Sequence, residues 1–191
     1  METTLAQYIP ESPLKRFVCF GPESTGKTTL TQDLAAYFGV PSVGEYMREY
    51  LQQKWNETRQ TCMWDDLVPI AVGQMQWENE QAQKSGNLLF CDTNLLELMT
   101  YSEIYYEGNC PSAIKKYALE NHYDFYFLTN IDVPWEADDL RDRPNDRQYM
   151  FDRFKETLDK YQKPYITLMG DAQQRLEAAV GTVRKIIQHH E

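Results

Sequence analysis

The sequence predicts an α/β fold of three layers, in which helices cover both faces of a mostly parallel five-stranded sheet. Three observations indicate this class. Short apolar runs of strand type alternate with longer segments of helical periodicity. A glycine-rich turn joins the first run to a helix. The hydrophobic content of 42% in 191 residues is enough for a sizeable core, and one domain over residues 1–191 is expected.

The predicted strands are short runs rich in aromatic and β-branched residues, at 16–20, 40–43, 88–91, 125–128 and 165–168. Segments with helical patterning separate them, at 28–38, 65–84, 94–106, 112–121 and 146–161. This alternation favours parallel strands whose carboxyl ends meet at one edge of the sheet. Ligands are expected at that edge.

Charge and composition exclude several kinds of partner. The chain has 19 Lys and Arg against 29 Asp and Glu, a net charge of −10, which disfavours nucleic acid and anionic membranes. No apolar run approaches the roughly 20 residues of a membrane helix, and no signal peptide is readable. Four scattered cysteines without a CxxC pair are expected to be reduced thiols. We expect a cytoplasmic protein with a small-molecule ligand, and leave homo-oligomer formation open.

The turn after the first strand fits a phosphate-binding loop. Residues 21–28 (the phosphate loop) read GPESTGKT and match G-x-x-x-x-G-K-[ST], the P-loop pattern. Gly21 and Gly26 can adopt conformations closed to other residues, which lets successive N–H groups face a phosphate at the helix N-terminus. Lys27, as an exposed loop side chain, is expected to contact the β- and γ-phosphates, and Thr28 to bind Mg²⁺. Further predicted contacts to ATP come from Glu23, Ser24, Thr25 and Thr29. The alternative is an ordinary glycine turn.

A phosphate loop leaves the reaction open, because ATPases, GTPases and small-molecule kinases share it. The absence of an [NT]KxD guanine signature disfavours a GTPase. The third strand ends on Asp92, where a Walker B carboxylate reaches the metal ion. Asp92 is therefore predicted as metal ligand, and as a catalytic and substrate-binding residue. The alternative is that it caps the helix beginning near Asn94, and both roles can coexist.

The second strand leads into the run VGEYMREY, which contains Glu45 and Arg48. This strand end is expected to face the γ-phosphate from the acceptor side, where a carboxylate can take a proton from a hydroxyl. Glu45 is the candidate base. Arg48 is expected to bind substrate or to keep Glu45 ionised. The alternative is a solvated ion pair of these two residues.

Residues 134–148 (the lid segment) have the composition of a mobile lid. The segment is polar, is broken by proline, and carries Arg141, Arg143 and Arg147. Guanidinium groups that close over a transferring phosphate stabilise its charge and exclude water. Arg141 is the candidate catalytic residue and Arg143 a candidate nucleotide ligand. The alternative is that interleaved Asp residues make a solvated loop that neutralises itself.

Together these motifs resemble the NadR-type ribosylnicotinamide kinase family. The resemblance spans about residues 15–180 and rests on GPESTGKTTL, VGEYMREYL, IAVGQMQWE, LLFCDT, YDFYFLTNIDVPWEADDLR and a late YxxIxLxGDxxQR. It implies a P-loop nucleoside-kinase fold that transfers phosphate from ATP with Mg²⁺ to the 5′-hydroxyl of nicotinamide riboside, giving nicotinamide mononucleotide. The chain has no room for the adenylyltransferase and DNA-binding domains of bifunctional members, so a stand-alone kinase is expected.

The resemblance also assigns residues. The matching positions are Gly26, Lys27, Thr28, Glu45, Arg48, Asp92, Asp138 and Arg141. Some members have an aromatic residue before the EY pair, where this chain has Gly44, and Asp139 stands where the family often has Gly. Trp77 is then the candidate for stacking on the pyridine ring, and Gln74 is a further predicted substrate-binding residue. The alternative for Trp77 is a core position. Gly170 and Asp171, after the fifth strand, are candidate contacts to adenine.

Two other functions stay open. A kinase for another nucleoside or small hydroxyl substrate would keep the same loop, Glu45 and lid segment. An AAA-like ATPase switch would hydrolyse ATP to drive a conformational change. It would need an arginine finger that reaches a neighbour and a helical lid domain, for which 191 residues leave little space.

Overall fold

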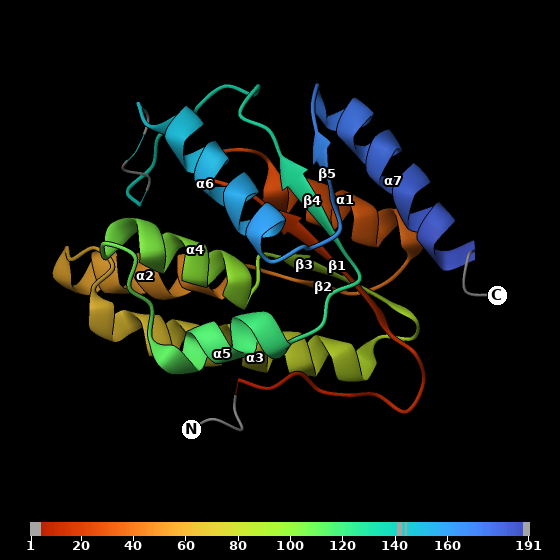
Figure 1. Cartoon of the computed structure of the whole chain (residues 1–191), viewed down its shortest axis with the longest axis horizontal. Helices are drawn as coiled ribbons and strands as arrows, with labels where there is room; N and C mark the ends of the chain where they lie inside the picture. The colour runs from red at the N-terminus through yellow and green to blue at the C-terminus, as the bar shows by residue number, and fades with distance from the viewer. Residues whose placement is uncertain (1–4, 141–142, 144, 189–191) are drawn as a thin grey trace.

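The structure, a computed structural model, describes residues 5–140, 143 and 145–188. Its centre is a parallel five-stranded sheet in the order β2-β3-β1-β4-β5 (Figure 1). The strands are β1 (Lys15–Phe20), β2 (Ser42–Val43), β3 (Leu88–Asp92), β4 (Phe125–Thr129) and β5 (Tyr165–Leu168). The predicted fold class is confirmed.

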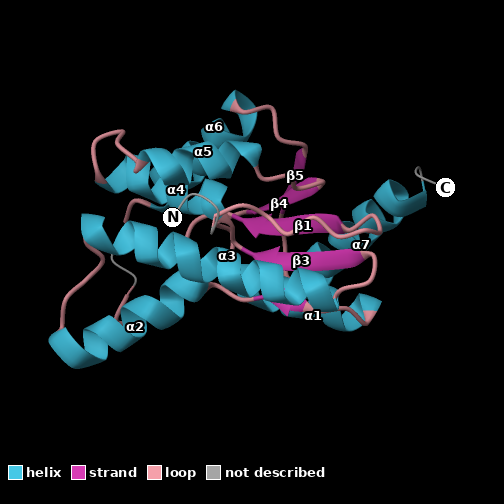
Figure 2. Cartoon of the chain, turned by 90° about the horizontal axis from the view of Figure 1, so that it is seen from below, coloured by secondary structure: helices cyan, strands magenta, loops and turns pink. Residues whose placement is uncertain are grey.

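Helices cover both faces of this sheet (Figures 1 and 2). One face carries α1 (Lys27–Phe38) and α7 (Ala172–Gln188). The other carries α3 (Leu67–Lys84), α4 (Leu95–Tyr105) and α6 (Arg147–Lys160), with α5 (Ser112–Glu120) packed on α4. The remaining helix, α2 (Tyr46–Thr58), packs on α3 beyond the sheet, and the short η2 (Trp64–Asp66) leads into α3.

The central strand β1 explains why the strand runs are apolar throughout. Phe17 and Cys19 belong to the core under α1 and α7, whereas Val18 and Phe20 belong to the core on the opposite face. Each of these side chains is at most 1% exposed. A parallel strand covered on both faces buries every side chain, so alternation of polar and apolar residues is not expected.

Two helices were absent from the sequence prediction. In α2 the only buried residue is Leu51, so the apolar stripe of this helix is too weak for the sequence pattern to reveal the helix. The α7 segment follows the last predicted strand and has a clear buried face. The second strand is also shorter than predicted, since only Ser42 and Val43 pair with β3.

The expectation of reduced thiols is confirmed, because all four cysteines are free. Among the described residues, no helix is long and apolar enough to cross a membrane.

Candidate active site

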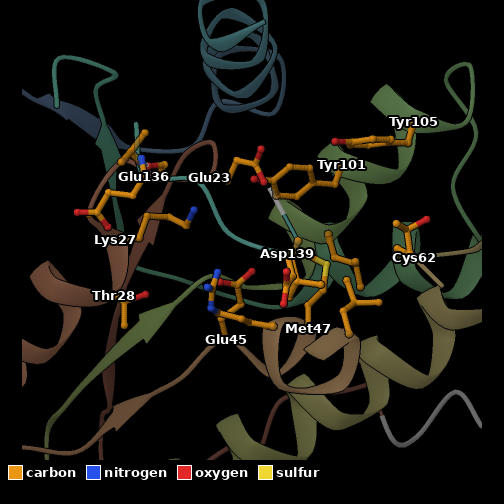
Figure 3. A pocket seen from close by; sticks show the side chains of 18 of the residues that line it. Glu23, Lys27, Thr28, Glu45, Met47, Cys62, Tyr101, Tyr105, Glu136 and Asp139 are labelled. Atoms are coloured by element: carbon orange, nitrogen blue, oxygen red, sulfur yellow. Dashed lines mark hydrogen bonds between the residues drawn. The ribbon is translucent and has the colours of Figure 1, made fainter. Parts of the chain in front are cut away.

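The phosphate loop joins β1 to α1 and borders a cavity of about 670 Å³ (Figure 3). Gly21 and Gly26 have φ angles of +144° and +82°, which favour glycine. Gly21 also approaches β4 closely, since a Cβ there would lie 2.7 Å from Thr129 Oγ1. Cavity-lining residues of this region are Glu23, Ser24, Thr25, Gly26, Lys27, Thr28 and Thr29. Gly21 is not among the lining residues, and the contacts of all these residues with ATP stay predictions.

The Lys27 ammonium is folded back on the loop. Its Nζ donates hydrogen bonds to the Gly21 carbonyl at 2.8 Å and the Pro22 carbonyl at 3.1 Å. Only 7% of Lys27 is exposed, so the expectation of an exposed loop lysine is wrong. Burial opposes the charge, but the carboxylates of Glu97, Glu45 and Asp92 outweigh it and raise the pKa of Lys27. Lys27 therefore stays charged, as phosphate binding requires.

Glu97, on the first turn of α4, is a site residue that the sequence reasoning missed. Its Oε1 lies 3.3 Å from Lys27 Nζ, and its Oε2 accepts a 3.3 Å hydrogen bond from the Gly21 N–H. Burial raises the pKa of Glu97 to about 8, although Lys27 acts against this. A usable signal existed: Glu97 is a lone acid in the apolar run LLELM.

Thr28 and Asp92 meet at the end of β3. The Thr28 hydroxyl donates to Asp92 Oδ2 at 2.5 Å, while the buried Asp92 Oδ1 has no hydrogen-bond partner among the described residues. Burial raises the pKa of Asp92, against the attraction of Lys27. Asn94, not Asp92, caps α4, because its side chain accepts from the Glu97 N–H. The capping alternative for Asp92 is wrong.

These two residues fit a Mg²⁺ ion held jointly with phosphate. A hydroxyl and a carboxylate with an unused oxygen are ligands that Mg²⁺ prefers. Within the described chain, no group of three or more His, Cys, Asp or Glu could hold a metal alone. Most of the ligands would therefore have to come from a bound nucleotide and water.

Glu45 lies at the start of α2 and lines the cavity next to the phosphate loop. The backbone on both sides of it is fixed by Gln74 of α3, which is 3% exposed. Gln74 Oε1 accepts from the Tyr46 N–H at 2.8 Å, and Gln74 Nε2 donates to the Gly44 carbonyl at 3.0 Å. Gln74 is not among the residues that line this cavity. Both ends of its amide are used on the backbone, and its contact with substrate stays a prediction.

Trp77 does not line the cavity either. Its ring packs edge-on against Tyr46, with centroids 5.0 Å apart, and belongs to the layer that surrounds the core. A Cβ on Gly44 would lie 3.5 Å from the Trp77 ring. The indole therefore fills the space beside Gly44, and its stacking on a substrate ring stays a prediction.

Arg48 extends from α2 toward the lid segment and pairs with Asp138. The hydrogen bond that Arg48 donates to the Asp138 carboxylate is the main reason that the pKa of Arg48 is raised. Arg48 also lines the cavity, as do Glu136, Asp139 and Leu140 of the lid segment. The ion pair thus connects two elements that border the same cavity.

The lid segment also rests on the phosphate loop. Arg147 donates to the carbonyls of Val133 at 2.8 Å and Ser24 at 3.2 Å, and the Glu136 N–H donates to Ser24 Oγ at 2.9 Å. Arg143 lies over the Tyr105 ring, 4.5 Å from its centroid. Arg143 does not line the cavity, so its contact with nucleotide stays a prediction. Arg141 lies outside the described residues.

Gly170 and Asp171 lie in the turn between β5 and α7. Neither lines the cavity, and their contact with adenine stays a prediction. Arg175, which the sequence reasoning missed, connects this turn to the phosphate loop: it is 3% exposed and donates to the carbonyls of Gly170 at 2.9 Å and Thr25 at 2.6 Å. It also pairs with Asp132 after β4. The positions of Thr25, Asp132 and Arg175 in the sequence do not indicate that these residues lie together.

Beyond Glu45 the cavity continues into an apolar and aromatic end. This end is lined by Met47, Leu51, Cys62, Leu67, Leu98, Tyr101, Tyr105 and Tyr106. Figure 3 shows Lys27 and Thr28 on one side of the cavity, Tyr105 and Cys62 on the other, and Glu45 between them. The three tyrosines were missed, although their spacing places Tyr101 and Tyr105 on one face of a helix. The arrangement has room for a phosphate-bearing ligand and a second molecule in line with it.

Comparisons with known proteins agree with this geometry. A family model described as an AAA domain matches residues 16–175. The trifunctional NAD biosynthesis/regulator protein NadR of Salmonella typhimurium is 29% identical over 139 residues, which cover 71% of this chain and 34% of that protein. The chain therefore spans about a third of the length of this relative.

Two solved structures show the same fold. A NadR protein in complex with NR superposes with a TM-score of 0.75 at 20% identity, over 91% of this chain and 51% of that one. A deoxyadenosine kinase from M. mycoides has a TM-score of 0.65 at 15% identity, over 89% of this chain and 99% of that one.

Proposed function

The chain belongs to the AAA domain family, and from this premise we propose that it is an ATP-dependent kinase that phosphorylates nicotinamide riboside to nicotinamide mononucleotide. One observation carries the proposal. A single cavity runs from the phosphate loop past Glu45 to the tyrosine-lined end, so a phosphate donor and a hydroxyl acceptor can lie in line. The relationship to NadR and the NR bound in the solved NadR structure support this choice of acceptor.

The donor half is the phosphate loop. Its backbone N–H groups and the charged Lys27 bind the ATP phosphates, and both act more strongly on the charge that develops during transfer. Thr28 and Asp92 would hold Mg²⁺, which when bound neutralises charge on the phosphate oxygens. The lid segment closes this half against water.

The acceptor half begins at Glu45. Its carboxylate accepts the proton of the attacking hydroxyl, and Gln74 holds it in place through the backbone. The apolar end binds a flat ring between tyrosine side chains. Glu23, Glu45, Glu136 and Asp139 all line the cavity, and their negative charge favours a cationic ring such as the pyridinium of nicotinamide riboside.

The test is an acceptor panel with ATP consumption and product identity as readouts. Nicotinamide riboside should be used at least about tenfold more efficiently, in kcat/KM, than deoxyadenosine, thymidine or a shikimate-like acid. Omission of Mg²⁺ should stop turnover. A preference for another nucleoside would mean that the protein is a kinase with a different substrate. ATP consumption that does not depend on any acceptor would instead favour an ATPase switch.

A further inference from the structure

Glu97 is a buried carboxyl group next to the lysine of the phosphate loop. It comes from α4, on the sheet face opposite α1, and only 1% of it is exposed. Its Oε1 lies 3.3 Å from Lys27 Nζ, and this contact raises the pKa of Lys27. Glu97 is not among the residues that line the cavity, so it contacts Lys27 from behind the loop.

Lys27 cannot keep all of its present partners when it binds phosphate. An ammonium has three protons. In this structure Lys27 uses two of them on the carbonyls of Gly21 and Pro22, and its third partner is the Glu97 carboxylate. Lys27 lines the cavity and Glu97 does not, so phosphate oxygens in the cavity can reach Lys27 without contacting Glu97. Nucleotide binding therefore draws the ammonium away from this carboxyl group.

We propose that Glu97 is a positioning residue that holds Lys27 in the unliganded loop, that nucleotide phosphates take Lys27 from it, and that at alkaline pH, where Glu97 is ionised before nucleotide binds, it then takes up a proton from solvent. The inference rests on the nucleotide-binding half of the proposed function. It assigns a role to a carboxyl group that phosphoryl transfer itself does not use.

The charges around Glu97 explain why it takes up a proton when Lys27 leaves it. Lys27 from α1 is the cation that stabilises its ionised form, together with the Gly21 N–H. Glu45 before α2 and Asp92 at the end of β3 are like charges that oppose ionisation. Tyr101 of α4 and Cys19 of β1 are neutral groups whose pKa values are raised, so neither supplies a positive charge. Loss of Lys27 and arrival of phosphate both favour the protonated carboxyl.

The pH dependence of nucleotide binding follows from this exchange. Glu97 has a pKa of about 8 in the unliganded protein, and nucleotide raises it further. Below about pH 7 Glu97 is protonated in both states, so affinity does not depend on its titration. Above about pH 8 binding requires proton uptake, and affinity should fall by up to about tenfold per pH unit. Phosphate groups lose their last proton near pH 6, so the ligand does not titrate in this range.

Calorimetry with ADP tests the proposal directly. Titrations in EDTA, which removes divalent metal, at about pH 7 to 9.5 in two buffers of different ionisation enthalpy give the number of protons bound per ADP. The wild-type protein should take up nearly none at pH 7 and approach one at pH 9.5. E97Q should show a flat affinity profile and should bind ADP more tightly than wild type at pH 9.5. E78Q removes another fully buried carboxyl group, distant from the loop and paired with Arg16, and should keep the wild-type slope.

Three outcomes overturn the proposal. If the wild-type protein binds ADP at pH 9.5 without proton uptake, the role of Glu97 is contradicted and the proposed function still stands. The same pH slope in E97Q assigns the proton to another group. ADP that binds at no pH contradicts both the inference and the proposed function. If E97Q does not fold, as judged by circular dichroism, the wild-type proton count decides the question by itself.

Discussion

Lys27 determines the donor half of the site, and K27A should lower kcat by at least about a hundredfold. The fold should survive at neutral pH, because Glu97, with a pKa of about 8, can be neutral there without its cation. The loss of thermal stability should grow above about pH 8. There wild-type Glu97 is already ionised beside Lys27, whereas the variant still has to ionise it unpaired.

Kinetics and thermal melts at about pH 6.5 and 9 measure both effects of K27A. K84A, which changes an exposed lysine at the end of α3, is the matched control and should behave as wild type. Near-normal turnover of K27A would remove Lys27 from the ATP site.

The E45Q variant distinguishes a catalytic role of Glu45 from a binding role. The amide keeps the shape and hydrogen bonding of the side chain but cannot accept a proton. We therefore expect kcat to fall by at least about a hundredfold while the KM for the nucleoside changes little. Steady-state kinetics with nicotinamide riboside as the varied substrate measure the changes in kcat and in KM separately. A change in KM alone would make Glu45 a binding residue, and Asp92 would be the next candidate base.

At the scale of elements, the contact between α2 and α3 positions Glu45. Gly73 of α3 has no room for a Cβ, which would lie 2.1 Å from the Tyr46 ring, so the first turn of α2 lies close against α3. Gln74 on the next position then reaches the backbone at Gly44 and Tyr46. The geometry of Glu45 is thus set by a helix that is distant from it in sequence.

Q74L should separate this positioning role from simple packing. It leaves the Tyr46 N–H and the Gly44 carbonyl without their partner, which costs about 1–3 kcal/mol in the free energy of unfolding. Because Glu45 moves with this backbone, kcat should fall by about tenfold or more while the KM for ATP is unchanged. Q76L, on the exposed face of the same helix, is the control for both kinetics and denaturant unfolding. Wild-type kcat in a folded Q74L protein would show that Glu45 does not depend on this clamp.

The contrast between predicted and missed elements has physical causes. Strands such as β1 and β3 and the phosphate loop were predictable, because apolar runs and glycine positions are local features of the chain. Glu97 and Arg175 were missed, because their roles depend on contacts with Lys27 and Thr25 across the fold. The periodicity at Trp77 fits both a core side chain and a ligand contact, and its packing against Tyr46 is likewise a contact that the local sequence does not show.

At the scale of the whole molecule, three separate contacts hold distant segments against the elements that border the cavity. The lid segment rests on the phosphate loop through Arg147 and Ser24, and Arg175 joins the β5–α7 turn to Thr25. The ion pair of Arg48 and Asp138 adds the contact to α2. Segments from the middle and end of the chain therefore hold the phosphate loop and α2, which border the cavity, and a change in one contact is expected to alter access to it.

The Arg48–Asp138 pair offers the sharpest test of closure, because stability and activity should respond differently. The two side chains are 45% and 25% exposed, so the pair contributes at most about 1 kcal/mol to the free energy of unfolding. D138R should leave thermal stability nearly unchanged, yet repulsion from Arg48 should hold the lid segment open. We expect a KM for nicotinamide riboside raised by at least about fivefold and more acceptor-independent ATP hydrolysis, because water enters the site.

The exchange variant R48D/D138R restores opposite charges and should recover much of the coupling between acceptor and ATP consumption, which a purely local effect of either substitution would not allow. D146A is the matched control: it removes an exposed lid carboxylate whose partner, Arg143, lies only three residues away, so no bridge to α2 is lost. The measurements are initial rates of ATP consumption with and without acceptor for all four proteins. Equal leakage in D138R and wild type would mean that this ion pair does not control closure, and the contacts of Arg147 with the phosphate loop would then be the ones to test.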